Sequence, residues 1–184
     1  MLVSSEIEVK IAVESARSAR KAILAAGFTV HVPRVFEANV IWDTPQQTLR
    51  SSSRLIRLRE AGKTSTLTFK GRSADTMHKI REEVETTVAR PLAMQRILSE
   101  VGLRPMFRYE KYRTEFSAAG NRGLVLLDET PIGTFLEIEG PARWIDRTAR
   151  ALGFGPDDYI LLSYGALYAA WCREHSVEPS NMTF

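Results

Sequence analysis

The chain has 184 residues, of which 44% are hydrophobic and 26% are charged. This composition suits one globular domain with a sizeable core and excludes a collagen-like, mucin-like or disordered chain. The net charge of +3, from 25 basic and 22 acidic residues, is too balanced to indicate a partner by itself. A lone cysteine, Cys172, excludes a disulfide framework and a cysteine-based zinc site.

The sequence contains no apolar run long enough to span a membrane, and its first ten residues do not resemble a secretory signal peptide. We therefore expect a cytoplasmic protein with no membrane partner. No repeat, low-complexity tract or linker divides the chain. The expected organisation is a single domain over residues 1–174, followed by a polar, loose tail over 175–184.

Two kinds of hydrophobic periodicity alternate along the chain, and they predict strands and helices. In chain order, we expect strand 5–12, helix 19–26, strands 36–43, 54–60, 65–71 and 79–88, helix 94–101, strands 107–117, 123–129 and 134–140, and helices 145–152 and 164–171. Gly27, Gly102 and Gly153 directly follow or end three of these helices, and Ser163 is placed to cap the fourth. The segment 51–53 is expected to be a loop.

Short turns separate several of the predicted strands, at residues 61–63, 119–121 and 131–133. Eight strands joined in this way favour an antiparallel sheet, which could close into a barrel.

Pairs of like charges recur on single strand faces, because alternate residues of a strand point the same way. The pairs are Glu6 and Glu8, Arg57 and Arg59, Glu83 and Glu85, Lys111 and Arg113, and Glu137 and Glu139. One interpretation is a sheet with an ordinary solvated face. However, like charges two residues apart repel each other, so each pair needs a counter-charge or a ligand nearby.

A ligand that suits both signs is a metal-bound triphosphate. Arginine and lysine bind phosphate oxygens, and carboxylates bind a hard divalent cation such as Mg²⁺ or Mn²⁺. The sequence therefore indicates a site where basic residues hold a phosphate chain and acidic residues hold metal ions.

The order of these motifs resembles the CYTH domain family, the triphosphate tunnel metalloenzymes, which include class IV adenylate cyclases and thiamine or inorganic triphosphatases. The resemblance begins with the E-x-E-x-K motif formed by Glu6, Glu8 and Lys10. The other matching segments are Arg57-Leu-Arg59, Phe69-Lys70-Gly71, Arg81-Glu-Glu83-Val-Glu85, Glu110-Lys111-Tyr-Arg113, Leu127-Asp128-Glu129, Glu137-Ile-Glu139-Gly140 and Ser163-Tyr164.

The resemblance implies an α+β fold: an eight-stranded antiparallel closed β-barrel that forms a tunnel, with flanking helices. It implies that a triphosphate-containing small molecule binds inside with Mg²⁺ or Mn²⁺. The implied metal ligands are Glu6, Glu8, Asp128, Glu137 and Glu139. The implied phosphate-binding residues are Lys10, Arg57, Arg59, Lys70, Arg81, Lys111 and Arg113. Lys10, Glu83 and Glu85 are the implied catalytic residues, with Lys10 near the scissile phosphate and the two glutamates positioning metal, water or an arginine.

One position departs from the family pattern. Ile41 stands in the segment 37–43 where many members carry a tyrosine, and in some triphosphatases that tyrosine pairs with the lysine to activate water. This departure keeps open a non-catalytic binder of polyphosphate or nucleotide. The other open functions are a phosphohydrolase, a class IV adenylate cyclase, and a protein that binds nucleic acid, including an RNA 5′ end. A cyclase would need a base pocket, for which Tyr109, Tyr112 and Trp42 are candidates, although ordinary packing explains each of them. A homodimer is compatible with the sequence.

Overall fold

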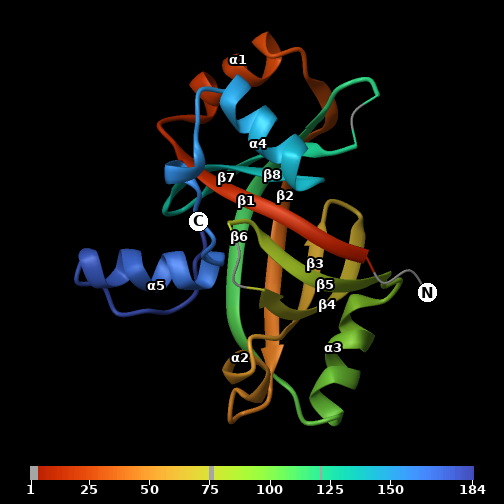
Figure 1. Ribbon diagram of the computed structural model, residues 1–184. Coiled ribbons are helices and arrows are strands. Elements are labelled where there is room, and N and C mark those ends of the chain that lie inside the picture. Colours follow the sequence, from red (N-terminus) through yellow and green to blue (C-terminus); the bar gives the residue numbers. More distant parts are fainter. Residues whose placement is uncertain (1–3, 75–76, 121) are drawn as a thin grey trace.

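The computed structural model describes residues 4–74, 77–120 and 122–184 (Figure 1). The strands are β1 (Ser4–Val13), β2 (Thr29–Asp43), β3 (Leu55–Ala61), β4 (Thr64–Ala74), β5 (Lys79–Thr87), β6 (Arg104–Ser117), β7 (Leu124–Thr130) and β8 (Gly133–Glu139). The helices are α1 (Ala16–Ala25), α2 (Thr48–Ser51), α3 (Pro91–Glu100), α4 (Ala142–Ala151) and α5 (Tyr164–Glu174), with a 3₁₀ turn η1 (Pro156–Asp158).

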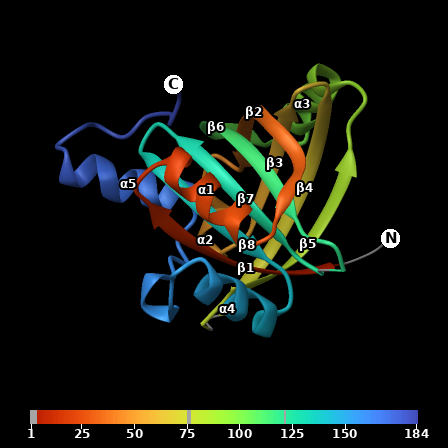
Figure 2. The ribbon, with the colours of Figure 1, turned by 90° about the horizontal axis from the view of Figure 1, so that it is seen from above.

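The eight strands form one closed antiparallel barrel in the order β1-β5-β4-β3-β2-β6-β7-β8. Strand β1 completes the closure, since it pairs with β5 along its first half and with β8 along its second half (Figure 2). Closure leaves no unpaired sheet edge and gives every strand an inner and an outer face. The predicted fold class is thereby confirmed.

Helices cover parts of the outer face of the barrel. Helices α1 and α4 lie together over β1, β7 and β8, where Ile23 and Ile145 pack against Val9 and Ile11 (Figure 1). Helix α3 covers another part of the barrel, where Leu98 contacts the cluster formed by Trp42 and Leu58. Burial of these apolar faces supplies the main stabilisation of the barrel wall.

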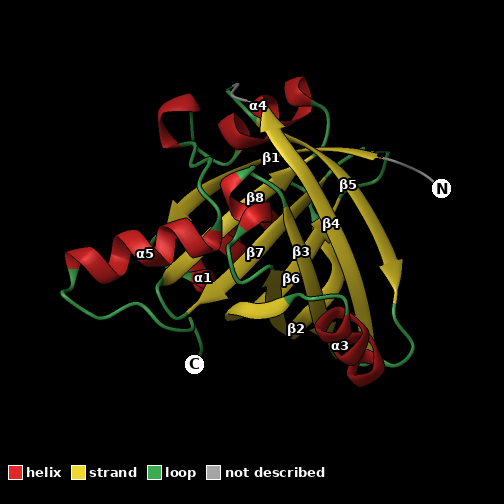
Figure 3. Cartoon of the chain, turned by 90° about the horizontal axis from the view of Figure 1, so that it is seen from below, coloured by secondary structure: helices red, strands yellow, loops and turns green. Residues whose placement is uncertain are grey.

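Helix α5 begins beside the barrel and extends away from it (Figure 3), and its first residue, Tyr164, lines the narrow end of the lumen. The hydroxyl oxygen of Ser163 accepts a hydrogen bond from the Ala166 amide, so the helix begins at Tyr164 as the sequence predicts. Tyr164 then packs against Phe135 and Tyr109, which project from β8 and β6. This end of the lumen is therefore filled by aromatic side chains.

Strand β2 and helix α2 differ from the sequence prediction. Strand β2 begins at Thr29, seven residues before the expected start at 36. The sequence did not predict this first half, because it is mostly exposed and lacks the alternation of a half-buried strand. The segment expected as a loop at 51–53 instead contains the end of α2. The carboxylate of Asp43 accepts hydrogen bonds of 2.9 Å from the backbone amides of Leu49 and Arg50, and these contacts hold that short helix.

The expectation of a loose tail is wrong. The tail returns to β6, where the Met182 amide donates to the Arg108 carbonyl at 3.0 Å and the Glu110 amide donates to the Met182 carbonyl at 2.8 Å. The Met182 side chain is completely buried beside α5. The tail therefore forms part of the folded domain. Within the described residues, no helix is long and apolar enough to cross a membrane.

Candidate active site

The paired charges of the strands turn into the barrel. The buried polar and charged side chains that face the lumen are Glu8, Lys10, Glu37, Asn39, Arg57, Thr68, Lys70, Arg81, Lys111, Arg113, Asp128 and Glu137. The interpretation of these pairs as a solvated outer face is therefore wrong. Because burying so many charges is costly, the lumen must satisfy them through mutual pairing, water or a ligand.

Two adjoining cavities follow the lumen. The larger, of about 680 Å³, forms the open mouth of the barrel, and the smaller, of about 70 Å³, continues toward α5. Glu6, Arg57, Arg59, Arg113 and Glu139 line both cavities. The lumen is thus wide at one end and narrow at the other, where Tyr164 lines its wall.

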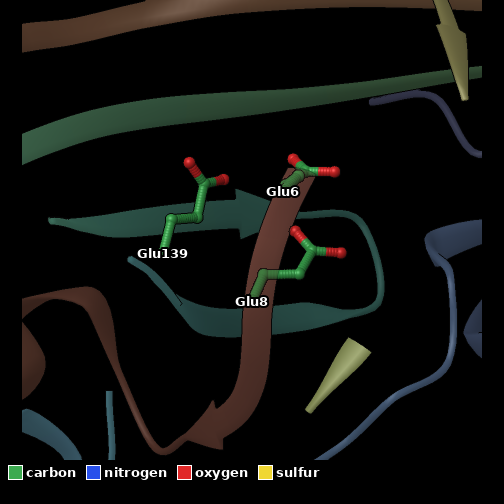
Figure 4. A group of neighbouring side chains, drawn as sticks. All are labelled: Glu6, Glu8 and Glu139. Carbon is green, nitrogen blue, oxygen red and sulfur yellow. The ribbon is translucent and has the colours of Figure 1, made fainter. Parts of the chain in front are cut away.

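Three carboxylates converge at the junction of the two cavities (Figure 4). Glu6 and Glu8 share one face of β1, and Glu139 lies directly opposite Glu8 in the pairing of β1 with β8. One oxygen from each of the three lies within 4.8 Å of the other two. Such a group of oxygen ligands suits a hard divalent cation.

The three carboxylates differ in their affinity for protons. Burial, together with the nearby Glu8 and Glu137 and against the opposing effect of Arg113, raises the pKa of Glu139 to about 8. Burial and the charge of Glu8 also raise the pKa of Glu6. Burial would raise the pKa of Glu8, but the ammonium groups of Lys79, Lys10 and Lys70 together outweigh burial and lower that pKa to about 2.

A second group of carboxylates lies deeper and is held by cations. Asp128 accepts two hydrogen bonds of 2.7 Å from the guanidinium of Arg113 and one of 2.7 Å from Lys111. Glu137 contacts Arg113 and lies 2.5 Å from the Lys10 ammonium. These cations outweigh the effect of burial and keep the pKa of Glu137 well below its usual range. The structure thus places these two expected metal ligands in ion pairs, outside the group formed by Glu6, Glu8 and Glu139, and their assignment stays a prediction.

Tyr164 belongs to this deeper group, although the sequence analysis placed it only on a helix and in the matching segment Ser163-Tyr164, with no role in the site. Its hydroxyl donates a 2.7 Å hydrogen bond to Asp128. The ammonium groups of Lys10 and Lys111 lie 4.4 Å and 4.9 Å from the centre of its ring, within the range of a cation–π interaction. Tyr164 therefore fixes the positions of one carboxylate and two lysines.

Arg57 and Arg59 form only long ion pairs with the carboxylates of the lumen. Arg57 lies 3.9 Å from both Glu83 and Glu85 and donates a 3.4 Å hydrogen bond to Thr68, and its Nε atom is buried with no partner among the described residues. Arg59 donates to Asn39 at 3.1 Å and lies 3.6 Å from Glu37. Both guanidinium groups keep donors available for phosphate oxygens at the wide cavity.

The remaining predicted residues lie on β4 and β5. The Lys70 ammonium lies 2.5 Å from Glu6 and 3.0 Å from Glu83. Arg81 is tied to the backbone, because it donates to the carbonyls of Gly71 and Ser53 at 3.0 Å and 2.7 Å. Glu85 accepts a 2.7 Å hydrogen bond from Thr68 and also lines the wide cavity.

Glu37 and Asn39 are lumen residues that the sequence analysis compared with the family pattern in the segment 37–43 but gave no role in the site. Their signal was available in the two-residue alternation of Glu37, Asn39 and Ile41, but the pairing that places Glu37 opposite Lys111 is not visible in the sequence. The cations around Glu37, with Lys111 first among them, outweigh burial and lower the pKa of its carboxyl group to about 2.

Of the three aromatic candidates for a base pocket, only one faces the lumen. Tyr109 lines the narrow cavity. Trp42 is buried outside the barrel in the cluster that contacts α3, and Tyr112 packs on the outer face beneath Arg34. The packing explanation is therefore confirmed for Trp42 and Tyr112.

Comparison with known proteins identifies the family of this chain. The CYTH domain family matches residues 4–147. The chain belongs to the CYTH domain family. A Methanocaldococcus jannaschii protein, named as a proposed adenylate cyclase, is 21% identical over 168 residues, covering 86% of this chain and 95% of that protein.

Solved structures share the CYTH fold. A Vibrio parahaemolyticus protein, also named as a proposed adenylate cyclase, superposes with a TM-score of 0.76 and 22% identity, over 89% of this chain and 97% of the other. A Hippeastrum protein described as a proposed adenylyl cyclase with a dominant triphosphatase activity gives 0.68 and 18%, over 90% and 96% of the two chains. At these identities, the structural likeness establishes the fold of this CYTH protein.

Proposed function

We propose that this CYTH protein is a divalent-metal-dependent phosphohydrolase that binds a triphosphate group inside its barrel. The observation that carries the proposal is the junction of the two cavities, where the carboxylates of Glu6, Glu8 and Glu139 face the same space as the guanidinium groups of Arg57 and Arg59. A phosphate chain with a bound cation is complementary to both sets of charges.

The acidic group fits Mg²⁺ or Mn²⁺ by its chemistry. All three side chains are carboxylates whose oxygens lie close together. Burial, and after it the charge of the neighbouring glutamates, raises the pKa of Glu6 and of Glu139. A cation held there would supply charge neutralisation for phosphate oxygens, which is the largest requirement of phosphoryl transfer.

The basic residues hold and orient the phosphate chain. Arg57 and Arg59 contact it from the wide cavity, and Lys10, Lys111 and Arg113 contact it from the narrow one. Burial would lower the pKa of Lys10, but Glu137, Glu8 and Asp128 together outweigh burial and raise that pKa, so this side chain stays charged. Lys10 is therefore better suited to neutralise a phosphate than to accept a proton, and Glu83 or Glu85 orients the attacking water.

Adenylate cyclase activity is the second candidate, supported by the names of the Methanocaldococcus jannaschii and Vibrio parahaemolyticus relatives. In that reaction the ribose 3′-hydroxyl of ATP attacks the α-phosphate and pyrophosphate leaves. The name of the Hippeastrum protein instead supports triphosphatase activity on this fold. Ile41, which faces the aromatic end of the lumen, keeps a non-catalytic binder as the third candidate.

A substrate panel with product identification tests the proposal. Purified protein would be incubated with tripolyphosphate, thiamine triphosphate or ATP in the presence of Mg²⁺ or Mn²⁺. We expect released phosphate, and we expect its release to stop when a chelator removes the metal. Cyclic AMP with pyrophosphate from ATP would establish the cyclase instead, and binding without turnover across metals and pH would establish the binder.

Arg57 provides a test of the binding geometry. Replacing Arg57 with alanine removes a charged hydrogen-bond donor worth about 1.5–3 kcal/mol, so the Kd for tripolyphosphate should rise by about 10- to 150-fold. Arg104, which donates to backbone carbonyls away from the lumen, is a matched control: Arg104→Ala should leave the Kd unchanged. An unchanged Kd in Arg57→Ala would show that Arg57 does not contact the phosphates.

A further inference from the structure

A row of arginines begins at the open mouth of the barrel and runs away from it along α4. Arg143, Arg147 and Arg150 are all exposed and, at spacings of four and three residues, lie on one face of that helix. We call these three residues the α4 arginine row. The residues just before α4, Gly140 and Pro141, line the wide cavity. The row therefore starts where the cavity opens to solvent and extends for about 10 Å along the helix axis.

Arg122 connects the mouth to this row. It is exposed and lines the wide cavity from the segment before β7. The neighbouring Gly123 is pressed against α4, because a Cβ atom added there would lie 2.3 Å from the ring of Trp144. Arg122 is therefore held beside the first turn of α4, and it joins the charges of the lumen to the charges of the row.

The row is electrostatically unfavourable for the protein alone. Arg143 and Arg147 are like charges one turn apart, and Arg143 lies in the first turn, where the helix dipole favours an anion. Within the described part of the chain, no carboxylate lies within 4 Å of Arg122 or of any member of the row. The acidic residue on α4 is Asp146. Its carboxylate accepts a hydrogen bond of 3.0 Å from Tyr159 and pairs with His78 at 2.8 Å. Asp146 also interacts electrostatically with Arg150.

We propose that Arg122 and the α4 arginine row form an outer site for a linear inorganic polyphosphate whose terminal phosphates occupy the lumen. This inference rests on the proposed function and extends its substrate class from a triphosphate to a longer phosphate chain. The narrow end of the lumen is closed by Tyr164 and its aromatic neighbours, so a chain enters from the wide mouth and its remainder lies outside. Arginine side chains that lack carboxylate partners are suited to bind those outer phosphates.

Inorganic polyphosphate fits the row better than RNA does. Single-stranded nucleic acid is held by aromatic side chains on which its bases stack, in addition to basic residues. Beside the row, Trp144 is buried beneath the helix and packs edge-on against Phe28. The hydroxyl of Tyr159 is engaged by Asp146. Trp144 is therefore not available to stack on a base, and Tyr159 is partly buried against the core, so the outer site recognises mainly phosphate charge.

Isothermal titration calorimetry with the full chain tests the proposal. The ligands are tripolyphosphate, a polyphosphate several times longer, and an RNA oligonucleotide with a 5′-triphosphate. The test variant is Arg143→Gln/Arg147→Gln/Arg150→Gln. The control is Arg17→Gln/Arg20→Gln/Lys21→Gln, which removes the same charge from α1, a helix that does not line either cavity.

For the wild type and the α1 variant, we expect the long polyphosphate to bind about tenfold or more tightly than tripolyphosphate, with a steeper dependence on salt. In the α4 variant this advantage of length should disappear while the affinity for tripolyphosphate is kept. An equal length advantage in all three proteins, or no advantage in the wild type, would overturn the outer site alone. A preference for the RNA that depends on the row would also overturn it in favour of a nucleic-acid surface. Failure of the wild type to bind tripolyphosphate would instead refute the proposed function.

Discussion

Glu137 and Glu139 lie two residues apart on β8 and face the same lumen, yet their surroundings give them opposite charge behaviour. Glu137 lies between Lys10 and Arg113, and these cations keep it ionised despite its burial. Glu139 lies beside Glu6 and Glu8, and burial and these neighbours favour its protonated form near neutral pH. One carboxylate therefore contributes to the folded state by itself, whereas the other needs a cation to become fully ionised.

Replacing each of these glutamates with glutamine separates the two roles. Glu139→Gln imitates the protonated carboxyl group, so the free energy of unfolding without metal should be unchanged or slightly higher, while Mg²⁺-dependent phosphate release should fall by about 10²-fold or more. Glu137→Gln leaves buried cations without a partner and should lower the free energy of unfolding by about 3 kcal/mol. Denaturant unfolding and phosphate release, measured on both variants, check this contrast. Equal losses of stability in the two variants would contradict it.

The ionised carboxylate of Glu37 makes the stability of the barrel depend on pH. Its pKa in the folded state, about 2, is below the ordinary value of 4.5, so the stabilisation is fully present above pH 4.5 and is lost as the pH falls toward 2. The shift corresponds to about 3 kcal/mol at neutral pH. In Glu37→Gln we expect a loss of that size at pH 7 that shrinks steadily below pH 4.5. Urea unfolding of both proteins across this pH range measures it, and a difference independent of pH would refute the assignment.

At the scale of elements, α5 and the tail act together at the narrow end of the lumen. Helix α5 inserts Tyr164 into the lumen, and the tail binds β6 through the backbone of Met182. The buried Met182 side chain packs in the same aromatic cluster as Tyr164 and Tyr168. The tail therefore holds in place the helix that positions Asp128 and the two lysines.

Met182→Ala should lower the free energy of unfolding by about 2–5 kcal/mol, because it removes a fully buried side chain and leaves a cavity. Met106, which is 39% exposed on β6, provides a matched control, and Met106→Ala should change the stability by less than about 0.5 kcal/mol. Chemical denaturation of the two variants makes the comparison. Similar small effects in both would mean that the tail does not contribute to the fold.

At the scale of the whole molecule, local patterns predicted the elements but not how they meet. Alternation of charged and apolar residues predicted the strands that carry the lumen, and Ser163 and Gly27 marked helix ends that the structure confirms. The exposed first half of β2 has no such alternation, so only the second half of that strand was predicted. The polar tail gave no sign of the single buried residue, Met182, that anchors it.

The candidate site shows the same limit. Resemblance to the family selected most of the lumen residues, but the contacts among them depend on register between strands that are distant in sequence. The pairing of β1 with β8 places Glu139 opposite Glu8 and Glu137 opposite Lys10. The pairing of β2 with β6 places Glu37 opposite Lys111. Neither pairing can be derived from one strand alone, because alternation specifies a face but not a partner.

The central claim is that acidic and basic groups in one lumen bind a metal and a phosphate chain together. The most direct measurement is calorimetric titration of tripolyphosphate into the wild type and Glu139→Gln, with and without Mg²⁺. We predict that the wild type binds tripolyphosphate more tightly with Mg²⁺ than without it, and that Glu139→Gln keeps the metal-free affinity but loses the gain from Mg²⁺. No binding by the wild type, or the same gain from Mg²⁺ in both proteins, would contradict the account.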